Sequence, residues 1–341
     1  MPPITHLIVE ESGAYIGKHQ GRLQVRKGRQ VLQEAPLLYL EEVIVCGRAV
    51  SFSADAVSAC AGQGIPIHFL SFRGTPYASL YSAGLTGTIM TRRAQLQAYH
   101  DARGLTVARA FTVAKLSNQL GLLRYLARYR KDREPDVHDE LSGLMAEMRA
   151  LLREVEELPM SDLETARPQL MGIEGRAAQK YWEAVRLSVA VGADWPGRRG
   201  RGAADPFNAA LNYAYGILYG QIERAILLAG LDPYAGFVHS DRPGKPSLVL
   251  DLIEEFRAVA ADRPVFALFN LGIAIQLDER GWLNDTSRRA VADRVLERLD
   301  SQELYQRRRM VLRSVIQTRA RQLAAFLRGE REAYPPFVAR Y

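Results

Sequence analysis

Short alternating runs of apolar and polar residues fill the first quarter of the chain. The runs "HLIVEES", "AYIGKHQGRLQVRKG", "VIVCG", "PIHFLSF" and "PYASLY" lie between His6 and Tyr81 and are separated by turn-forming residues, as is typical of β-strands. One insert, "SADAVSACAGQG", has the composition of a helix instead. The pattern predicts a small, mostly β domain over residues 1–82.

The spacing of apolar residues changes after a glycine- and threonine-rich segment at 83–93, which we expect to be a linker. In "VARAFTVAKLSNQLGLLRYLARYRK" large apolar residues recur close to the helical period of 3.6: Phe111, Leu116, Leu120, Leu123 and Leu126. Most of the chain to residue 341 has this character, and a basic break, "PGRRGRGAADP", separates two long helices. The predicted fold class is therefore α+β, a small N-terminal mostly β domain followed by a large all-α C-terminal domain at 94–341.

A helix is predicted to begin at Ser247 in "KPSLVLDLIEEF", because a serine after a proline is a favourable N-cap. Its apolar residues fall on one stripe: Val249, Leu252, Ile253 and Phe256. Asp251, Glu254 and Glu255 fall on the opposite face, where Asp251 and Glu254 are one turn apart and can point to a common centre. A solvated acidic face near a helix N-terminus explains these carboxylates equally well.

His239 precedes this helix by a loop, "SDRPGKP", whose two prolines and glycine can turn the chain back. A histidine nitrogen with two or three carboxylate oxygens is a suitable ligand set for Mn²⁺ or Mg²⁺ at a phosphate-processing site. Arg242 and Lys245 in the same loop suit a phosphodiester better than an apolar core. The stretch from His239 to Glu254 is therefore a candidate metal site, although a lone histidine is more often structural.

Glu174 is a further carboxylate in an unusual setting. It lies between Gly172 and Gly175 in "LMGIEGRAAQKYWEAV", an otherwise strongly helical segment, where each interior glycine costs about 1 kcal/mol relative to alanine. Small residues allow a ligand or another backbone to approach the Glu174 side chain, and Tyr181 continues the same helical face. Close packing of two helices explains the glycines equally well.

Basic charge is concentrated near the C-terminus. The chain has a formal net charge of +7, and residues 288–331 hold 12 arginines against 5 acidic residues. This segment indicates a surface that faces a polyanion, and a solvated helical face is the simpler alternative.

The two cysteines and the N-terminus exclude other classes of protein. Cys46 and Cys60 lack the spacing of a zinc, iron–sulfur or disulfide site, so we expect both to be packing residues. The start "MPPITHLIVEESGAY" has no export signal, and no run of about 18 uncharged apolar residues occurs. We therefore expect a cytoplasmic protein with no membrane partner.

Three motifs follow one another in the C-terminal part: "GIEGRAAQKYWEAV", "DPFNAALNYAYGILYGQI" and "GLDPYAGFVHSDRPGKPSLVLDLIEEFR". In this order they resemble the CRISPR-associated protein 1 family, the metal-dependent endonuclease and integrase that inserts new spacers into CRISPR arrays. The segment "EEVIVCGRAVSFSADAVSACAGQGIPIHFLS" is similar to part of that family's N-terminal domain, so the resemblance covers nearly the whole chain.

The resemblance implies partners as well as a fold. It implies a homodimer assembled largely through the N-terminal domains, and a complex with CRISPR-associated protein 2. The CRISPR-associated protein 4 nuclease is a further candidate partner. No cysteine-rich extension is present, so the iron–sulfur nuclease that is fused to some relatives is not expected in this chain.

The resemblance also implies the residues of the reaction centre. The family's first metal-binding glutamate falls on Glu174, its histidine on His239 and its last acidic ligand on Glu254. The family varies between aspartate and glutamate at this last position, and Asp251 competes with Glu254 as the direct ligand. These four residues are the expected catalytic residues, with Mg²⁺ or Mn²⁺ as the cofactor.

The expected reaction is phosphoryl transfer, in which the 3′ end of a spacer precursor or a water molecule attacks a phosphodiester. We expect contacts to DNA from cations near the centre and in the basic break: Arg198, Arg199, Arg201, Arg242, Lys245 and Arg257. Asn208, Asn212 and Tyr181 are candidates for orienting the metal ligands. Buried amides that tie two helices together explain the asparagines equally well.

Two other functions fit parts of the same sequence. In a non-catalytic nucleic-acid-binding scaffold the acidic cluster would be structural and the arginines would carry the function. A hydrolase of small phosphate esters is disfavoured, because such a site needs a few cations rather than a surface of them. No helix-turn-helix, zinc finger or RNA-binding aromatic motif is evident, so we expect the DNA, including branched DNA and the CRISPR repeat, to be recognised mostly by shape and backbone.

Overall fold

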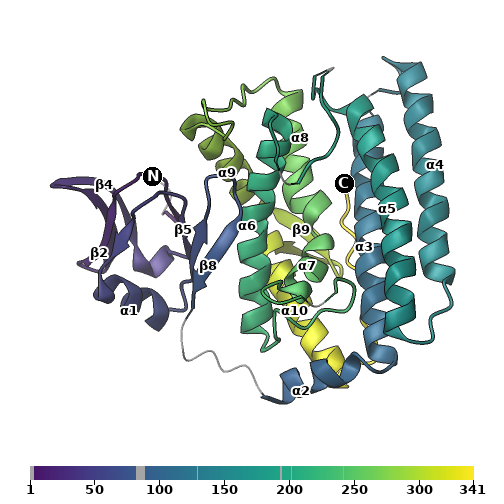
Figure 1. The fold of residues 1–341 in the computed structure, drawn as a ribbon, viewed down its shortest axis with the longest axis horizontal. Coiled ribbons are helices and arrows are strands. Elements are labelled where there is room, and N and C mark those ends of the chain that lie inside the picture. The colour runs from purple at the N-terminus through teal and green to yellow at the C-terminus, as the bar shows by residue number, and fades with distance from the viewer. Residues whose placement is uncertain (1–3, 82–88, 129, 193, 201, 241) are drawn as a thin grey trace.

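The computed structural model of the chain describes residues 4–81, 89–128, 130–192, 194–200, 202–240 and 242–341 (Figure 1). Strands come first and helices follow, which confirms the predicted fold class. The expected linker falls partly outside the described residues, at 82–88, and its remainder is helical, because α2 begins at Ile89.

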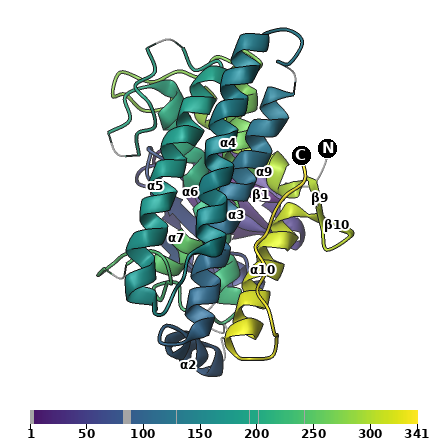
Figure 2. The same ribbon diagram turned by 90° about the vertical axis from the view of Figure 1, so that its right-hand side faces the viewer.

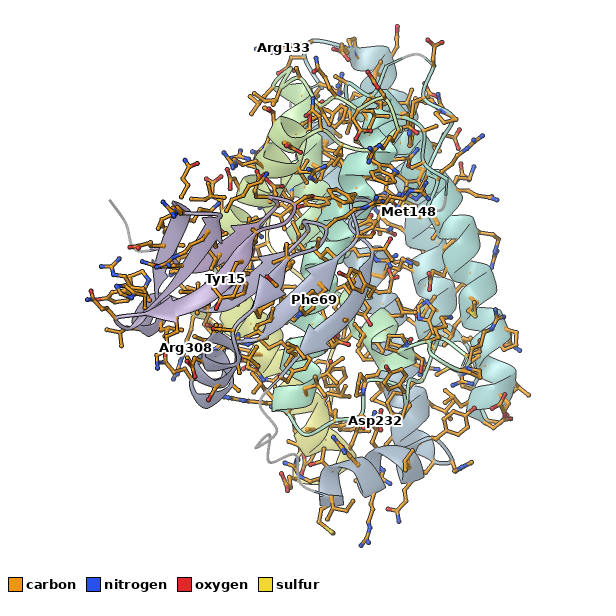
Figure 3. The ribbon with its side chains drawn as sticks, turned by 60° about the vertical axis from the view of Figure 1, so that its left-hand side comes forward. Tyr15, Phe69, Arg133, Met148, Asp232 and Arg308 are labelled. Atoms are coloured by element: carbon orange, nitrogen blue, oxygen red, sulfur yellow. The ribbon has the colours of Figure 1, made fainter. Side chains whose placement is uncertain are left out.

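Two four-stranded sheets form most of the N-terminal part, with the strand orders β1-β5-β7-β8 and β4-β3-β2-β6. Tyr15 on β2 and Phe69 on β7 mark the two sheets in Figure 3. The elements are β1 (His6–Val9), β2 (Tyr15–His19), β3 (Arg22–Lys27), β4 (Gln30–Pro36), a 3-10 turn (Leu37–Tyr39), β5 (Glu42–Val45), β6 (Ser51–Phe52), α1 (Ala54–Gly62), β7 (Ile67–Leu70) and β8 (Pro76–Leu80).

Helices form nearly all of the C-terminal part: α2 (Ile89–Ala98), α3 (Ala102–Ala127), α4 (Pro135–Glu157), α5 (Leu163–Ser188), α6 (Pro206–Leu228), α7 (Ser247–Glu254), a π-helical turn (Arg257–Asp262), α8 (Arg263–Asn270), α9 (Asp285–Asp300) and α10 (Leu312–Leu327). The predicted basic break does separate α5 from α6. Among the described residues, no helix combines the length and the apolar character needed to cross a membrane.

A two-stranded hairpin, β9 (Gln302–Tyr305) and β10 (Arg308–Val311), interrupts the helices and was not predicted (Figure 2). Its turn residues, Gln306 and Arg307, have φ angles of 48° and 66°. Hairpin turns of this kind normally use asparagine or glycine, which tolerate a left-handed backbone. The sequence therefore lacked the usual turn signal. Strand β4 was also missed, because exposed and intermediate positions dominate it.

The β1-β5-β7-β8 sheet is docked on α6, and Figure 1 shows β8 beside this helix. Helix α9 also reaches the N-terminal part, where Arg288 Nε lies 3.4 Å from Glu10 Oε1. Strand β5 is buried on both faces: Val43 and Val45 point into the N-terminal core, while Ile44 belongs to the core of the helical part. Cys46, at the end of β5, is buried and lies 3.3 Å from the Tyr213 hydroxyl of α6. Both cysteines are free and buried, as predicted.

Two glycines allow this docking. A Cβ atom at Gly216 of α6 would lie 1.6 Å from the carbonyl oxygen of Gly74, and one at Gly74 would lie 2.3 Å from the Tyr213 Cα atom. Gly74 also has a φ angle of +75°, which favours glycine. The backbone of the 71–75 turn therefore rests directly on the backbone of α6.

We predict that Gly216→Ala lowers the free energy of unfolding by about 1–3 kcal/mol or more, because the new methyl group forces the two backbones apart. Urea denaturation followed by circular dichroism measures this. The matched control is Gly143→Ala in α4, where a Cβ atom meets nothing within 4 Å. This control should raise stability by about 0.5–1 kcal/mol. Equal stability of both variants would mean that the N-terminal part does not rest on α6.

Candidate metal centre

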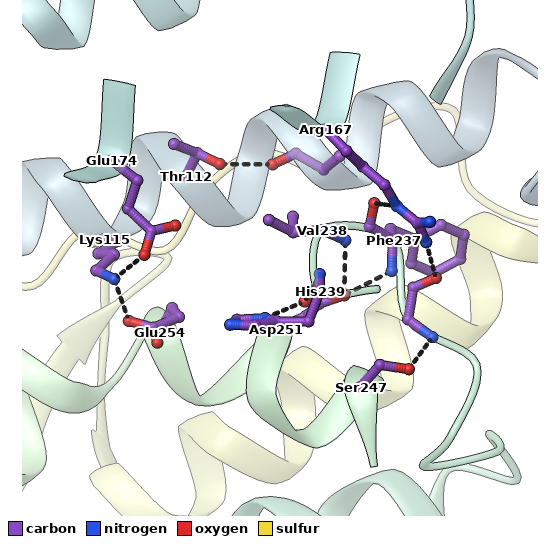
Figure 4. Close-up of polar contacts among 12 residues, drawn as sticks. Thr112, Lys115, Arg167, Glu174, Phe237, Val238, His239, Ser247, Asp251 and Glu254 are labelled. Carbon is purple, nitrogen blue, oxygen red and sulfur yellow. Dashed lines mark hydrogen bonds and ion pairs between the residues drawn. The ribbon is translucent and has the colours of Figure 1, made fainter. Parts of the chain in front are cut away.

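Three helices bring ionisable side chains together in the C-terminal part (Figure 4). Lys115 comes from α3, Glu174 from α5 and Glu254 from the end of α7. The Lys115 Nζ atom contacts Glu174 Oε1 and lies 2.8 Å from Glu254 Oε2. On the other side, Arg257 Nη1 lies 2.9 Å from Glu254 Oε1. Two of the three predicted ligands are thus neighbours that share one buried ammonium group.

Asp251 lies behind His239 and fixes it. Its side chain is fully buried and accepts hydrogen bonds from the backbone N–H groups of Phe237 (2.5 Å), Val238 (3.0 Å) and His239 (2.8 Å). The His239 Nδ1 atom lies 2.7 Å from Asp251 Oδ1. Since a carboxylate accepts and does not donate, Nδ1 is the ring nitrogen that donates in this contact, and Nε2 is the nitrogen that could bind a metal ion. An outer carboxylate orients many metal-binding histidines in this way.

Two expectations about α7 can be compared with the structure. Asp251 and Glu254 line one small space, and both oxygens of Asp251 accept hydrogen bonds from the 237–239 segment, so Asp251 holds that segment in place. The acidic face is not solvated: Asp251, Glu254 and Glu255 are 0%, 5% and 0% exposed. The apolar stripe of the helix is buried, as predicted.

Small residues and side-chain donors hold the loop that carries His239. A Cβ atom at Gly236 would lie 2.7 Å from Asp251 Oδ2, so only glycine fits there. The Ser247 hydroxyl accepts the Gly236 N–H (3.0 Å) and donates to the Tyr234 carbonyl, so it ties the loop instead of capping α7 as predicted. Arg167 of α5 donates from Nε to the Phe237 carbonyl (3.1 Å; Figure 4).

The donor atoms at this point fit a divalent cation. His239, Glu174, Asp251 and Glu254 line one small space, together with Lys115. Imidazole nitrogen with carboxylate oxygen is a donor set for Mg²⁺ or Mn²⁺. The buried Oε2 atom of Glu254 accepts no hydrogen bond of ordinary geometry, although Lys115 is near. His239 and Glu174 side chains remain 21% and 20% exposed, so the centre has an open side.

Charges around Glu254 keep it ionised. Burial by itself would raise the pKa of this carboxyl group, but Arg257 and Lys115 outweigh burial and lower the pKa to about 2. Burial would likewise lower the pKa of Lys115, and the charges of Glu254 and Glu174 raise it instead. Both groups are therefore charged near neutral pH, which leaves Glu254 ready to act as a ligand.

The glycines beside Glu174 do not serve helix packing. A Cβ atom at Gly172 or at Gly175 would meet nothing within 4 Å, and both residues are exposed. Of the two explanations that the sequence left open, the structure therefore excludes close contact with another described helix. Gly172 and Gly175 therefore present only backbone to the surface beside Glu174.

Asn208 and Asn212 do not orient the ligands; they hold the basic loop. The Arg198 guanidinium donates to Asn208 Oδ1 (3.1 Å) and to Asn212 Oδ1 (2.7 Å). The amide of Asn208 donates to the Gly197 carbonyl and that of Asn212 to the Gly200 carbonyl. Arg198 thus donates hydrogen bonds to residues of α6. The glycine-rich sequence around Arg198 did not predict these contacts within the protein.

Tyr181 is likewise directed away from the ligands. It is fully buried and donates from Oη to Asp262 Oδ2 (2.7 Å), while Tyr215 donates to the other oxygen (2.5 Å). Burial raises the pKa of Asp262 to about 6, against the opposing effect of the two tyrosines and of Arg257. The expected role of Tyr181 in orienting ligands therefore finds no contact among the described residues.

The remaining cations expected to contact DNA have different surroundings. Arg199 and Arg242 are exposed, Lys245 is half-buried, and Arg242 and Lys245 form a short antiparallel bridge in the loop after His239. Arg257 is paired with Glu254. Arg201 lies outside the described residues.

Sequence reasoning missed Lys115 and Arg319. The only signal for Lys115 was a lysine inside the apolar run "FTVAKLSNQL". Arg319 of α10 forms a two-pronged ion pair with Glu255, at 2.9 Å and 2.6 Å, and stacks on the Tyr334 ring at 3.9 Å. Both cations balance carboxylates that are distant in the sequence, so no local pattern could reveal them.

A second cluster of potential ligands lies at the border with the N-terminal part. One ligand atom from each of His6, Glu41 and Asp300 lies within 4.8 Å of the others. Arg313 already lies among them, with Nη2 3.0 Å from His6 Nε2 and 3.2 Å from Asp300 Oδ1, and with Nε 3.1 Å from Glu41 Oε2. A guanidinium thus fills the position of a cation, and the cluster is an ion network between the two parts of the chain.

Comparison with known proteins places the chain in a family. A family model described as "CRISPR associated protein Cas1" matches residues 7–297. The CRISPR-associated endonuclease Cas1 1 of Archaeoglobus fulgidus is 38% identical over 346 residues, which cover 98% of this chain and 99% of that protein. The chain belongs to the Cas1 family. The resemblance carried by the three sequence motifs is thereby confirmed.

Solved structures share the fold of this Cas1 family member. A casposase bound to integration product has a TM-score of 0.80 at 23% identity, over 97% of this chain and 93% of that chain. A chain of a Cas6-RT-Cas1–Cas2 complex has a TM-score of 0.77 at 20% identity, over 99% of this chain and 36% of that chain. Identities this low establish the fold alone.

The Glu255–Arg319 pair gives a stability prediction. Arg319→Ala leaves the buried Glu255 carboxylate without its cation, so we expect the free energy of unfolding to fall by about 3–5 kcal/mol. The control is Arg294→Ala, which removes an exposed partner of Glu297 and should change stability little. Urea denaturation of both variants measures the difference. Similar small losses in both would contradict the burial of the Glu255 pair.

Proposed function

We propose that the chain is a divalent-metal-dependent DNA endonuclease and integrase of CRISPR adaptation, which inserts spacer DNA into the repeat array by phosphoryl transfer. One observation carries the proposal: Glu174, His239 and Glu254 converge from two helices and a loop in a chain of the Cas1 family. The relative from Archaeoglobus fulgidus is named an endonuclease, and the casposase of matching fold is bound to an integration product, which supports both activities.

The proposed cofactor is Mg²⁺ or Mn²⁺, held by His239 Nε2 and by the carboxylates of Glu174 and Glu254. When bound, such an ion polarises the scissile phosphate and stabilises charge on the leaving 3′ oxygen. Asp251 holds the imidazole with its proton on Nδ1, so Nε2 faces outward as a donor. His239 therefore serves as a ligand rather than as a general base, because a ligand nitrogen must stay unprotonated.

The DNA-binding surface that we propose is narrower than the arginine-rich segment 288–331. Six of its 12 arginines pair with carboxylates inside the protein: Arg288, Arg294, Arg298, Arg313, Arg319 and Arg328. Arg307, Arg308 and Arg309 are exposed at the tip of the β9–β10 hairpin (Figure 2), and no ion pair of theirs occurs among the described residues. We propose that these three arginines, consecutive and exposed together, meet a polyanion.

Cavities beside the hairpin extend the basic surface. One of about 380 Å³ is lined by Arg263, Arg298, Arg309 and Arg340. It shares Arg263 and Arg298 with a cavity of about 810 Å³, whose lining includes Arg130, Arg133 and Arg294. Arginine forks match phosphate oxygens and carry no base information by themselves. This supports recognition of spacer, repeat and branched DNA mostly through shape and backbone.

We also propose that residues 1–82 form a dimerisation domain and residues 94–341 the catalytic domain. Exposed apolar side chains on and beside the edge strand β4 support a homodimer through the N-terminal domains: Val31, Leu32, Leu38 and Tyr39. The fold match within a Cas6-RT-Cas1–Cas2 complex supports Cas2 as a partner, and a Cas4 nuclease remains a candidate. A cytoplasmic location accords with a DNA substrate.

One observation favours the alternative of a non-catalytic nucleic-acid-binding scaffold. Lys115 already pairs with Glu174 and Glu254, so these carboxylates have a structural partner. Cleavage of a branched duplex in the presence of Mn²⁺, and its loss with EDTA, supports the enzyme. Tight DNA binding without cleavage under either condition supports the scaffold.

We predict that Glu174→Ala, His239→Ala and Glu254→Ala each abolish Mn²⁺-dependent cleavage and strand transfer. Asp251→Asn should reduce activity by about 10–100-fold, because it disturbs the orientation of His239 rather than a ligand. Gel assays on branched DNA measure both activities, and circular dichroism verifies folding. Glu183→Ala, an exposed position of the same helix as Glu174, should retain activity. Full activity of folded His239→Ala would refute the proposed centre.

The hairpin gives a prediction for DNA binding. Arg308→Gln with Arg309→Gln should weaken binding to duplexes of unrelated sequence equally, since these arginines are proposed to meet phosphates rather than bases. The slope of log K against log salt should fall by about 0.9 for each phosphate that is no longer neutralised, so by about 1.8 in the double variant. Arg307 is kept because of its left-handed backbone, and Arg328→Ala serves as a control with an internal partner. An unchanged slope would place the DNA elsewhere.

A further inference from the structure

An aromatic and basic cluster lies at the border between the N-terminal and helical parts, away from the proposed metal centre. The Phe72 ring, from the turn between β7 and β8, stacks on the Trp282 ring, from the loop before α9, with ring centroids 5.4 Å apart and planes 8° apart. Three guanidinium groups lie 5.6–5.8 Å from the centroid of the tryptophan ring: those of Arg48, Arg73 and Arg280. Segments that are distant in the sequence thus meet at one tryptophan.

The three arginines lack a carboxylate partner in the part of the chain that the structure describes. All three are exposed, and none of them forms a salt bridge there. Arg288, whose guanidinium lies 5.1 Å from the Phe72 centroid, differs from them because Glu10 and Asp285 balance its charge. Like charges that gather around one ring repel one another, so an anion bound among them would be stabilised.

Two cavities open beside the stacked rings. One of about 490 Å³ is lined by four aromatic rings and two of the arginines: Phe69, Phe72, Tyr77, Trp282, Arg48 and Arg73. The other, of about 420 Å³, shares Phe72, Arg73 and Trp282 with the first. Both volumes lie within the range of about 300–1,000 Å³ that is typical of small-ligand pockets. The Tyr77 side chain is 67% exposed, so its ring is open to a ligand.

Backbone hydrogen bonds hold the two stacked rings in place. Asp278 Oδ1 accepts the Trp282 N–H (3.0 Å), and the Trp282 carbonyl accepts the Asp278 N–H (2.6 Å). The turn that carries Phe72 is closed by a hydrogen bond from the Gly74 N–H to the Ser71 carbonyl (2.8 Å), and it rests on α6. These segments therefore have little conformational freedom to lose when a ligand stacks on the rings.

An unpaired nucleotide combines the two chemistries that this cluster offers. Its base is a flat ring that stacks on aromatic side chains, and its phosphate pairs with guanidinium groups. Bases inside a duplex stack on one another and do not present their faces, whereas bases of a single strand do. A basic surface alone would suit a duplex equally well. The aromatic rings therefore favour a single strand.

We propose that the cluster binds unpaired nucleotides of a DNA strand, with a base on the Tyr77 ring and phosphates on Arg48 and Arg73. The inference rests on the proposed function, since DNA is taken as the source of the nucleotides. The three proposed metal ligands are not among the described residues that line the two cavities. The site is therefore separate from the proposed metal centre and needs no metal ion.

The test compares DNA binding by the full-length protein in the presence of EDTA. The probes are a labelled blunt duplex of about 20 base pairs and the same duplex with a 3′ or a 5′ overhang of about five thymidines. By fluorescence anisotropy, the wild type should bind one of the overhang probes at least about fivefold more tightly than the blunt duplex, which is the effect of one stacked base. The same overhang should quench tryptophan fluorescence, and Trp282→Leu should remove this quenching.

Matched variants separate the ring from the charge. Tyr77→Leu removes a ring from an exposed position and should reduce the preference for the overhang at least about fivefold, whereas Tyr77→Phe should keep it. Arg48→Gln with Arg73→Gln should lower the slope of log K against log salt for a single-stranded oligothymidine by about 1.4, which is about 0.7 for each phosphate. Arg149→Gln with Arg153→Gln removes the same charge from exposed positions of α4 and should leave this slope unchanged.

Equal binding of the blunt and overhang probes by the wild type would overturn the inference and leave the proposed function standing. A full preference in folded Tyr77→Leu would overturn it too, and so would quenching that survives Trp282→Leu. Free thymidine monophosphate that binds as tightly as the overhang would exclude a DNA strand as the source. The preference should survive His239→Ala, and its loss there would mean that the two sites are one. Failure of the wild type to bind any of the DNA probes would instead refute the proposed function itself.

Discussion

Buried negative charge on α7 is the constraint on which the helical part depends. A carboxylate inside a protein is tolerated only where cations or N–H groups meet it. Asp251 is met by the backbone of the loop that carries His239, Glu254 by Lys115 and Arg257, and Glu255 by Arg319. These partners come from the 237–239 segment, from α3, from the π-helical turn after α7 and from α10. Two turns of helix thus fix the relative positions of elements that are far apart in the chain.

The cations that balance these buried carboxylates also matter for the proposed chemistry. Glu254 could not serve as a ligand if burial made it neutral, and its neighbours Arg257 and Lys115 prevent this. The π-helical turn that begins at Arg257 widens the helix directly after these carboxylates. Such turns often occur at functional sites. Here the turn follows α7, the helix that carries Glu254. Its first residue, Arg257, lies three positions after Glu254 and pairs with the Glu254 carboxylate.

The sequence predicted the order of strands and helices, the apolar stripe of α7 and, through the resemblance, the three proposed ligands. It could not assign roles within the acidic face. A helical period shows that Asp251 and Glu254 leave the same side of α7, but not that a loop covers one and α3 the other. Lys115 is 59 residues from Glu174 along the chain, a separation that no local pattern spans. The β9–β10 hairpin was not predicted for a different reason. Gln306 and Arg307 adopt a left-handed turn conformation that glutamine and arginine seldom take.

Gly172 and Gly175 add no side chain to the exposed surface of α5 beside Glu174, whose own side chain is 20% exposed. The surface of the helix is therefore low at these two positions. A rigid ligand can come closer to the α5 backbone there than a longer side chain would permit.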